Sequence, residues 1–418
     1  MRSRHRTGDT RHSEPADVAT LHGLPAALAA TTGAQSLATL AVFVLPVLAP
    51  HVARDLGVAP HLVGYQVALI YMAAAAASMM SGGVLARGGP ARSTQIALAA
   101  GGLGCAAISL GGISGAALGS VLLGLGYGLT NPAATQVLNR LAPPARRNLV
   151  FSVKQMGVPI GAALAGLILP SLGLALGWRG AAAMVAVALV LAALGLGVFH
   201  QAWDRTHDPD CAAPRPVASR LGTMAVLRTR PGLMALATTG ALFSAVQLSL
   251  GAYAVTMLVD EFKWGVVAAG AAAAAIQASG ALARLAWAAV ADRRGAGLPV
   301  LAAIGLCTAA AALTVPLAPG WPSAAVLILL CAFGSCSAGW TGVAMAEAAR
   351  LAPAGAAGTS AGGVLAVTYA GIVVGPPVFA GAVAMLGSYA GAFAALAILP
   401  LLGAVTAWRA HHRAPAPS

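Results

Sequence analysis

Long apolar runs alternate with short polar segments along almost the whole chain. A helix needs roughly 20 mostly apolar residues to cross a bilayer, and twelve runs are long enough. The first six lie near 24–50, 61–82, 94–114, 116–138, 147–172 and 178–200, and the second six near 232–259, 265–289, 298–318, 323–346, 357–385 and 388–409. Only a Gly-rich turn around Gly115 separates spans three and four. The pattern predicts an all-α integral membrane protein with twelve transmembrane helices.

Two segments of the first half recur in the second half at nearly the same distance. The tetrapeptide Arg-Leu-Ala-Pro occurs at 140–143 and again at 350–353, an offset of 210 residues. A Gly-x-x-x-Gly segment with prolines follows each copy, at 157–161 and at 371–375, an offset of 214 residues. Both offsets are close to half of the chain. Such a repeat predicts two parallel six-helix bundles related by pseudo-symmetry.

The polar segments divide the chain into five parts. Residues 201–230 form the longest internal polar stretch, and they lie between the two repeats. We therefore expect an N-terminal tail at 1–23, a first bundle at 24–200, a cytoplasmic linker at 201–230, a second bundle at 231–410 and a short tail at 411–418.

Composition and the positions of the basic residues agree with this organisation. Hydrophobic residues make up 59% of the chain and charged residues only 8%, whereas a soluble domain carries about 25% charged residues. Nineteen of the 24 Lys and Arg residues fall on the side that holds both termini, three fall on the other side and two lie within spans. The positive-inside rule then puts both termini in the cytoplasm of a multi-pass inner-membrane protein. Nucleic-acid binding is not expected, because no basic run is interleaved with aromatic residues.

The sequence contains no arrangement typical of an enzyme or a metal site. The Gly-x-x-x-x-Gly-Lys-Ser/Thr motif of ATP hydrolysis is absent, and no nucleophile–base pair falls within reach in sequence. The five cysteines lie mostly inside apolar segments and lack metal-ligand spacing. We therefore expect a protein without catalytic activity, cofactor or metal ion.

Short motifs at the span ends are typical of one family. Ala-Asp-Arg-Arg-Gly at 291–295 follows span eight, and the corresponding segment after span two has Ala86 where that family has an acidic residue. Gly-Trp-Arg at 177–179 and Gly-Trp-Thr-Gly at 339–342 add to the pattern. With twelve spans in two parallel halves, the chain resembles the major facilitator superfamily over roughly residues 24–410. The resemblance implies a secondary transporter that works by alternating access.

Ionisable side chains inside the hydrocarbon are costly and are therefore functional candidates. None of the eleven acidic residues lies in the middle of a span, whereas Arg284 and Lys154 both lie within spans. Arg284 shares a helical face with Gln277 and Trp287, and Gln155 follows Lys154. Arg binds carboxylates through two parallel hydrogen bonds, and the pattern resembles organic-anion and monocarboxylate carriers, several of which have an Arg on span eight. Both cations are therefore predicted to contact an anionic substrate.

Each cation also has a second interpretation. A long basic side chain near the end of a span can extend to the membrane surface while its stem stays in the apolar region. Arg284 is also close enough in sequence to pair with Asp292.

Polar residues on four other spans extend the candidate site. Spans one, four, seven and ten line the central cavity in the family that this chain resembles. The candidates on these spans are Gln35, Asn131, Gln247, Tyr253 and Trp340. Hydrogen bonds between helices are the alternative role for such residues.

Two glycine pairs are predicted to let helices approach closely, namely Gly157 with Gly161 and Gly371 with Gly375. Tight packing is the favoured role, and a flexing contact between the two halves is compatible with it.

A group of charges is predicted on the cytoplasmic face if spans eight and ten are neighbours there. We expect it to latch the two halves while the outside is open. It consists of Asp292, Arg293, Glu347 and Arg350.

These patterns together predict a transporter for a small organic anion, with a carboxylate as the preferred class. Its site is expected near the middle of the membrane between the two halves. The expected partners are the substrate and the lipid bilayer, with a coupling proton or a counter-anion left open, and we expect a monomer. The alternatives are an efflux pump for hydrophobic drugs or other metabolites and, in another class, a membrane receptor or scaffold that transports nothing.

Overall fold

The structure is a computed structural model that describes residues 23–143, 147–204, 227, 231–352 and 357–413. Within these ranges every regular element is a helix. Most of the expected linker at 201–230 and most of both expected tails lie outside the described residues. The last helix continues to Arg413, three residues past the expected end of the second bundle at 410.

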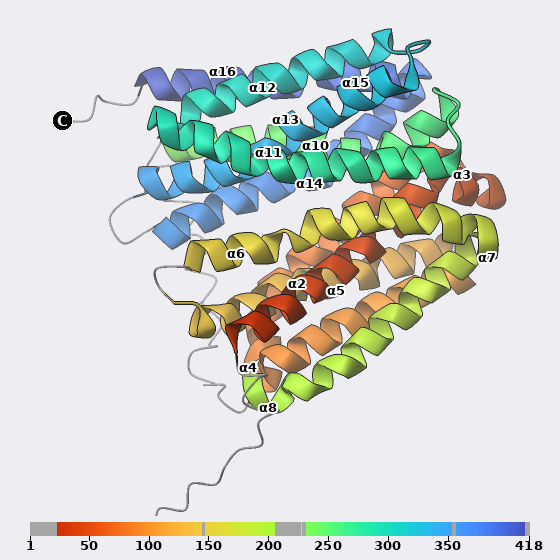
Figure 1. Ribbon diagram of the computed structural model, residues 1–418, viewed down its shortest axis with the longest axis vertical. Coiled ribbons are helices and arrows are strands. Elements are labelled where there is room, and N and C mark those ends of the chain that lie inside the picture. Colours follow the sequence, from red (N-terminus) through yellow and green to blue (C-terminus); the bar gives the residue numbers. More distant parts are fainter. Residues whose placement is uncertain (1–22, 144–146, 205–226, 228–230, 353–356, 414–418) are drawn as a thin grey trace, which may run out of the picture.

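The first half of the chain forms the bundle drawn from red to yellow-green in Figure 1. Its elements are α2 (Leu24–Val42), α3 (Val44–Leu56), η1 (Pro60–Leu62), α4 (Val63–Leu110), α5 (Ile113–Leu141), α6 (Arg147–Gln155), α7 (Gly157–Gly195), η3 (Leu196–Phe199) and α8 (His200–Trp203).

Two long helices of this bundle are each divided by a glycine. A straight 48-residue helix such as α4 would be about 72 Å long, more than twice the roughly 30 Å of a bilayer core. Gly89 in α4 has φ 75° and Gly177 in α7 has φ 71°, a backbone region that side-chain-bearing residues rarely adopt. The chain reverses at each glycine, so α4 holds spans two and three, and α7 holds most of span five and span six as far as Gly195.

The second half forms the bundle drawn from green to violet-blue in Figure 1. Its elements are α10 (Pro231–Asp260), α11 (Val266–Arg294), α12 (Gly297–Thr314), η5 (Val315–Leu317), α13 (Ser323–Leu351), α14 (Ala357–Leu386), α15 (Tyr389–Leu396) and α16 (Ile398–Arg413).

The twelve-helix prediction is confirmed. The described residues contain eleven apolar helical stretches long enough to cross a membrane, and one of them, Val150–Phe199, is divided into two spans at Gly177. The turn expected at Gly115 is wrong by a few residues, because α4 ends at Leu110 and α5 begins at Ile113. Gly115 instead lies inside α5, where a Cβ would collide with the Ala107 carbonyl of the preceding span.

The two sides of the bundles are named here by chain direction. The terminal side is the one where α2 begins and α16 ends. The far side is the opposite one, where α3 ends and α7 turns back at Gly177. In Figure 1 the helices run across the view, with the terminal side at the left and the far side at the right.

Glycine pairs form equivalent close crossings in both bundles. A Cβ on Gly161 of α7 would overlap the Ser36 carbonyl of α2, and a Cβ on Gly371 of α14 would overlap the Ala241 carbonyl of α10. Gly157 and Gly375 lie against the same partner helices. Backbones can approach this closely only where side chains are absent. The glycines that were selected from the sequence thus lie between helices of one bundle.

Contacts between the two bundles gather on the far side. Gly166 of α7 and Gly270 of α11 lie so close that a Cβ on either would overlap the other's carbonyl. The Tyr253 hydroxyl of α10 donates to the His61 carbonyl of the first bundle at 2.7 Å and also lies 3.2 Å from the Pro376 carbonyl of α14. The far side is therefore closed between the bundles.

Several carboxylates accept hydrogen bonds from the backbone amides at which helical segments begin. Asp204 accepts hydrogen bonds from the Ala91 and Arg92 amides at 2.8 and 3.3 Å, directly after the turn at Gly89. Glu261 accepts from the amides of Tyr389 and Ala390, where α15 begins. Free amides and the helix dipole both favour a negative group at this position. These acids hold the ends of the spans, which leaves the membrane interior to other residues.

A larger side chain at the crossing of α7 and α11 should open the far side. Overpacking costs about 1–3 kcal/mol, so Gly270→Leu is expected to shift the population away from the closed arrangement. Spin labels on cysteines that replace Leu176 and Leu317, both exposed near the far side, should report longer distances in this variant. Gly381→Leu is the control, since nothing lies within 4 Å of a Cβ there. Unchanged distances in Gly270→Leu would contradict the role of this crossing.

Candidate functional site

The Lys154 ammonium lies at the centre of a ring of amide oxygens. The residue is near the end of α6, about 10 Å from the start of that helix, and only 2% of it is exposed. Nζ donates to Gln35 Oε1 of α2 at 3.0 Å, to Gln155 Oε1 at 3.2 Å and to Asn131 Oδ1 of α5. The structure therefore brings together four residues that the sequence had selected on three different spans.

The partners of this ammonium are all neutral. The acidic residues of the described chain lie at helix ends or in turns, and those with a described ion-pair or hydrogen-bond partner contact other groups, among them Asp55 with Arg179, Asp204 with His200 and Glu347 with Arg350. A buried charge needs hydrogen bonds and a counter-charge to offset its lost hydration. Lys154 has the hydrogen bonds, and its charge remains available to an anion.

A second layer of hydroxyl groups holds the amides in place. Thr130 of α5 donates to Gln35 Oε1 at 3.0 Å, and Gln35 Nε2 donates to Thr39 at 3.5 Å. Thr39 in turn hydrogen-bonds the Tyr127 hydroxyl. The ring of Tyr127 packs edge-on against that of Tyr71, with 5.8 Å between their centroids. The polar network thus runs from Lys154 to two tyrosines on α4 and α5.

Arg284 approaches the same region from the second bundle. It lies on α11, about 15 Å from the terminal end of that helix, because α11 continues five residues past the expected end of span eight. Its Nε donates to the Ala338 carbonyl of α13 at 3.2 Å. The guanidinium also lies within electrostatic range of the Tyr127 phenol, which belongs to the first bundle.

The neighbours of Arg284 show which face of α11 meets the lipid. Leu282 and Leu285 are 68% and 63% exposed, whereas Arg284 is half-buried. Asp292, the alternative partner of Arg284, is exposed two turns further along the helix. Arg284 therefore lies away from the lipid-facing side of α11, hydrogen-bonded to the Ala338 carbonyl and within electrostatic range of the Tyr127 phenol.

The far side is closed directly above this region. Phe43 and Val67 of the first bundle meet Leu248 and Ala252 of the second around a residual cavity of only 10 Å³, which Tyr71 also lines. A cavity of this size holds about one water molecule. The centre between the bundles is therefore separated from the far side.

The remaining candidates of the second bundle do not form one site. Trp340 Nε1 donates to Gln247 Oε1 at 3.0 Å, which pairs α13 with α10. The Trp287 indole lies against Gly339, and the Gln277 amide lies near Gly251 and Phe43. The structure thus places Gln247 and Trp340 in contact with each other and leaves them apart from the Lys154 ring.

Tyr253 lies elsewhere. Its hydroxyl closes the far side through the His61 carbonyl, and its ring stacks on Phe379 with 4.5 Å between centroids. These contacts connect Tyr253 to the closed far side and not to the amides around Lys154.

The four residues of the expected charge cluster all belong to the second bundle. Glu347 accepts hydrogen bonds from Arg350 and, at 3.2 Å, from the Gly297 amide at the start of α12. The bonded carboxylate raises the pKa of the Arg350 guanidinium above its usual value. Asp292 and Arg293 are exposed on the terminal side. A latch between the halves would need a partner from the first bundle, so that role stays a hypothesis.

Three tyrosines near the centre had not been selected as site residues. Tyr71 lies in an otherwise apolar run, so the surrounding sequence does not distinguish it from a core residue. Tyr127 lies four residues before Asn131 and shares its helical face, a signal that points to the same cavity. Tyr369 of α14 lies within electrostatic range of both other phenols.

Comparisons with known proteins agree with this architecture. The family profile described as Major Facilitator Superfamily matches residues 31–376. No curated protein matches the sequence significantly.

Two solved structures illustrate the similarity of the fold. A bacterial homologue of the human lysosomal transporter Spinster, in an inward-facing and unoccupied conformation, has a TM-score of 0.75 at 15% identity and covers 93% of this chain and 97% of its own. The peptide transporter POT in complex with sulfate has a TM-score of 0.71 at 16% identity, with 96% of each chain covered. At these identities the likeness shows the fold alone.

A pair of substitutions tests whether the Lys154 charge is kept for function. Lys154→Met removes a buried ammonium that has only neutral partners, so the melting temperature of the purified protein is expected to stay unchanged or rise. Gln35→Leu leaves the ammonium with one acceptor fewer and should cost about 1–3 kcal/mol of stability. In the double variant the cost of Gln35→Leu should shrink, because the charge is gone. A large loss of stability in Lys154→Met alone would show that the ammonium is a structural group.

Proposed function

Given that the chain belongs to the Major Facilitator Superfamily, we propose that this membrane transporter carries a small organic anion, with a carboxylate as the preferred class. The observation that carries the proposal is the pair of cations at the centre. Lys154 comes from the first bundle and Arg284 from the second, and the contacts described for both are neutral groups. An anion between them would supply the counter-charge that the described protein does not provide.

The strength of this argument comes from the surroundings of the charges. Two unit charges 4 Å apart attract by about 1 kcal/mol in water and by about 4 kcal/mol at an effective dielectric constant of 20. A carboxylate can replace one of the three amide oxygens around Lys154 and accept its charge-assisted hydrogen bond, and it can accept a bidentate pair from the Arg284 guanidinium. The two cations therefore favour an anion over a neutral molecule of the same shape.

Alternating access follows from where the two cations are anchored. An anion that contacts Lys154 and Arg284 at once connects the two bundles, so its binding energy depends on their relative position. The closed far side, with Gly166 against Gly270 and Tyr253 on His61, supports an arrangement that is open toward the terminal side. The bias of Lys and Arg residues assigns the terminal side to the cytoplasm. We therefore propose an inner-membrane carrier, active as a monomer.

The mode of coupling follows from the kinds of residues at the centre. No carboxylate of the described chain contacts the Lys154 ring, so a proton site of the usual acidic kind has no candidate there. Anion exchange, facilitated diffusion or a proton that travels on the substrate itself are the modes that fit.

Efflux of hydrophobic drugs is the second candidate, and the tyrosines favour it. Tyr71, Tyr127 and Tyr369 bring aromatic surfaces to the same region as the two cations. Such surfaces suit a cargo that has an apolar or aromatic body beside its negative group. An anionic aromatic compound would satisfy both proposals.

Thermal stabilisation by organic anions tests the proposal. A ligand at 100 times its dissociation constant stabilises a protein by about 2.7 kcal/mol. Loss of one charged hydrogen-bond donor costs about 1.5–3 kcal/mol, so Arg284→Gln and Lys154→Gln should each weaken binding roughly tenfold or more. The measurement is the shift of melting temperature of the purified protein across a panel of mono- and dicarboxylates.

Arg294→Gln is the matched control, since Arg294 is exposed on the same helix and lies outside the expected charge cluster. It should respond to the stabilising anions as the unmodified protein does, and those anions should be taken up by liposomes that contain it. An anion that stabilises Arg284→Gln and the unmodified protein equally would remove Arg284 from the site.

A further inference from the structure

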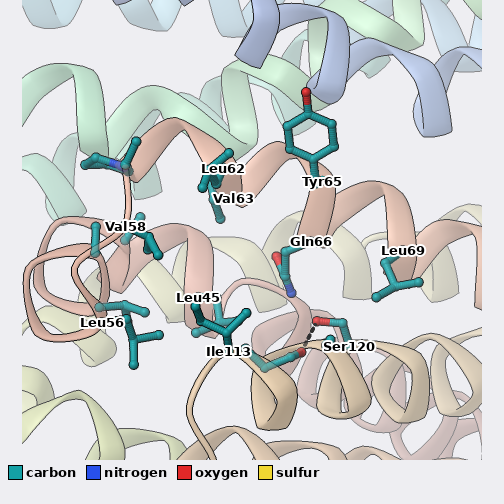
Figure 2. A pocket seen from close by; sticks show the side chains of 17 residues that line it. Leu45, Leu56, Val58, Leu62, Val63, Tyr65, Gln66, Leu69, Ile113 and Ser120 are labelled. Atoms are coloured by element: carbon teal, nitrogen blue, oxygen red, sulfur yellow. Dashed lines mark hydrogen bonds between the residues drawn. The ribbon is translucent and has the colours of Figure 1, made fainter. Parts of the chain in front are cut away.

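A separate cavity lies within the first bundle near the far side. It has a volume of about 400 Å³, is open on one side, and is bordered by α3, α4, the turn between them and the start of α5 (Figure 2). Its lining comes from the first bundle alone, so this cavity is distinct from the centre between the bundles. Cavities that hold small molecules usually measure about 300–1,000 Å³.

The walls of this cavity are almost entirely apolar. Leu45 and Leu56 of α3, Leu69 of α4 and Ile113 of α5 contribute the larger side chains. The described lining contains no charged side chain. A charged molecule would lose its hydration in this cavity without compensation, so an occupant has to be mostly apolar and uncharged.

One polar side chain inside the cavity has no partner. Both the nitrogen and the oxygen of the Gln66 amide are buried and make no hydrogen bond to the described residues. Figure 2 shows this amide directed from α4 toward α5, on the side of Ser120, whereas Tyr65 points the opposite way. Buried amides are nearly always hydrogen-bonded. Gln66 therefore keeps an unused donor and an unused acceptor at the cavity wall, and a rotation of its side chain would present both to an occupant.

Ser120, which is fully buried, places a second polar group behind the same wall. Its hydroxyl donates to the Ala116 carbonyl at 2.6 Å, so its oxygen remains able to accept a hydrogen bond. The polar atoms thus lie at one spot of an otherwise apolar cavity.

We infer that this cavity binds an uncharged alkyl chain with a single hydroxyl group, which enters from the lipid leaflet on the far side. The chain fills the apolar volume between α3, α4 and α5. The hydroxyl donates to the Gln66 carbonyl oxygen and accepts from the Gln66 amide nitrogen. Entry from the membrane is consistent with the exposed side chains of Leu62 and Ile113, which line the cavity and face outward.

Occupancy of the cavity would also act on the closure between the bundles. Pro60, Leu62 and Val63 line the cavity and flank His61, whose carbonyl accepts the Tyr253 hydroxyl at 2.7 Å. A molecule packed behind this segment supports it in the position that closes the far side. Binding is therefore coupled to the closed arrangement.

Photo-crosslinking in liposomes tests the site. The probe is 1-decanol with a diazirine in its chain, and the comparison probe is the corresponding decane. Peptides that contain 45–69 and 113–120 should be labelled by the alcohol at least tenfold more than the lipid-facing residues of α11. Gln66→Leu should lower labelling by the alcohol to the level of the alkane, while labelling by the alkane stays the same or rises.

A filled cavity provides the second variant. Ala117→Phe puts a ring into the volume that Ala117 lines, and labelling of these peptides should fall at least tenfold. Leu118→Phe is the matched control, because Leu118 is the next residue and is exposed outside the lining; its labelling should be unchanged. Spin labels at Leu176 and Leu317 should report a larger closed fraction with decanol present.

Two results would overturn the inference. The first is evidence that labelling does not come from the cavity: the two peptides are labelled no more strongly than the lipid-facing surface, or Ala117→Phe leaves their labelling unchanged. The second is equal labelling of the unmodified protein by the alcohol and the alkane, which would remove the Gln66 amide from the site. The melting temperature of each variant shows that it is folded.

Discussion

The burial of one ammonium group among neutral oxygens governs the centre of this protein. Lys154 is nearly inaccessible, and its hydrogen bonds to Gln35, Asn131 and Gln155 offset part of the hydration that it lost. Amide dipoles stabilise a cation without neutralising it, so the region keeps a positive potential in a medium of low polarisability. These partners belong to α2, α5 and α6. Small displacements of α2 or α5 would therefore change how strongly the charge is stabilised.

Close helix crossings make such a centre possible. Gly161 on Ser36 brings α7 against α2, which sets α6 and the Lys154 side chain beside Gln35. Gly371 on Ala241 repeats this crossing in the second bundle. At the far side, Gly166 and Gly270 let the two bundles touch backbone to backbone. Because packing between helices in a membrane depends on close contact of surfaces, the same absence of side chains provides rigidity within a bundle and a separable contact between bundles.

Apolar run length and the internal repeat were sufficient to predict the twelve helices and their parallel halves. They were also sufficient to select Lys154, Gln155, Asn131 and Gln35, since polar residues inside apolar runs are conspicuous. Tyr71 escaped notice because an aromatic residue in an apolar run is as typical of the core as of a site. Tyr253 was selected for its proximity in sequence to Gln247, but six residues of helix turn it toward the other bundle and the far side. Sequence spacing sets the face of a helix, whereas depth and neighbours depend on tertiary packing.

The two cations explain why a carrier would keep costly charges on different bundles. If both were on one bundle, an anion would bind equally well whatever the position of the other, and binding would not influence the exchange between states. With Lys154 on the first bundle and Arg284 on the second, the proposed anion would be bound most strongly in the arrangement that brings both cations to it. In the proposed mechanism the substrate acts as the counter-ion of both cations, and the polar contacts of each cation stabilise it while the site is empty.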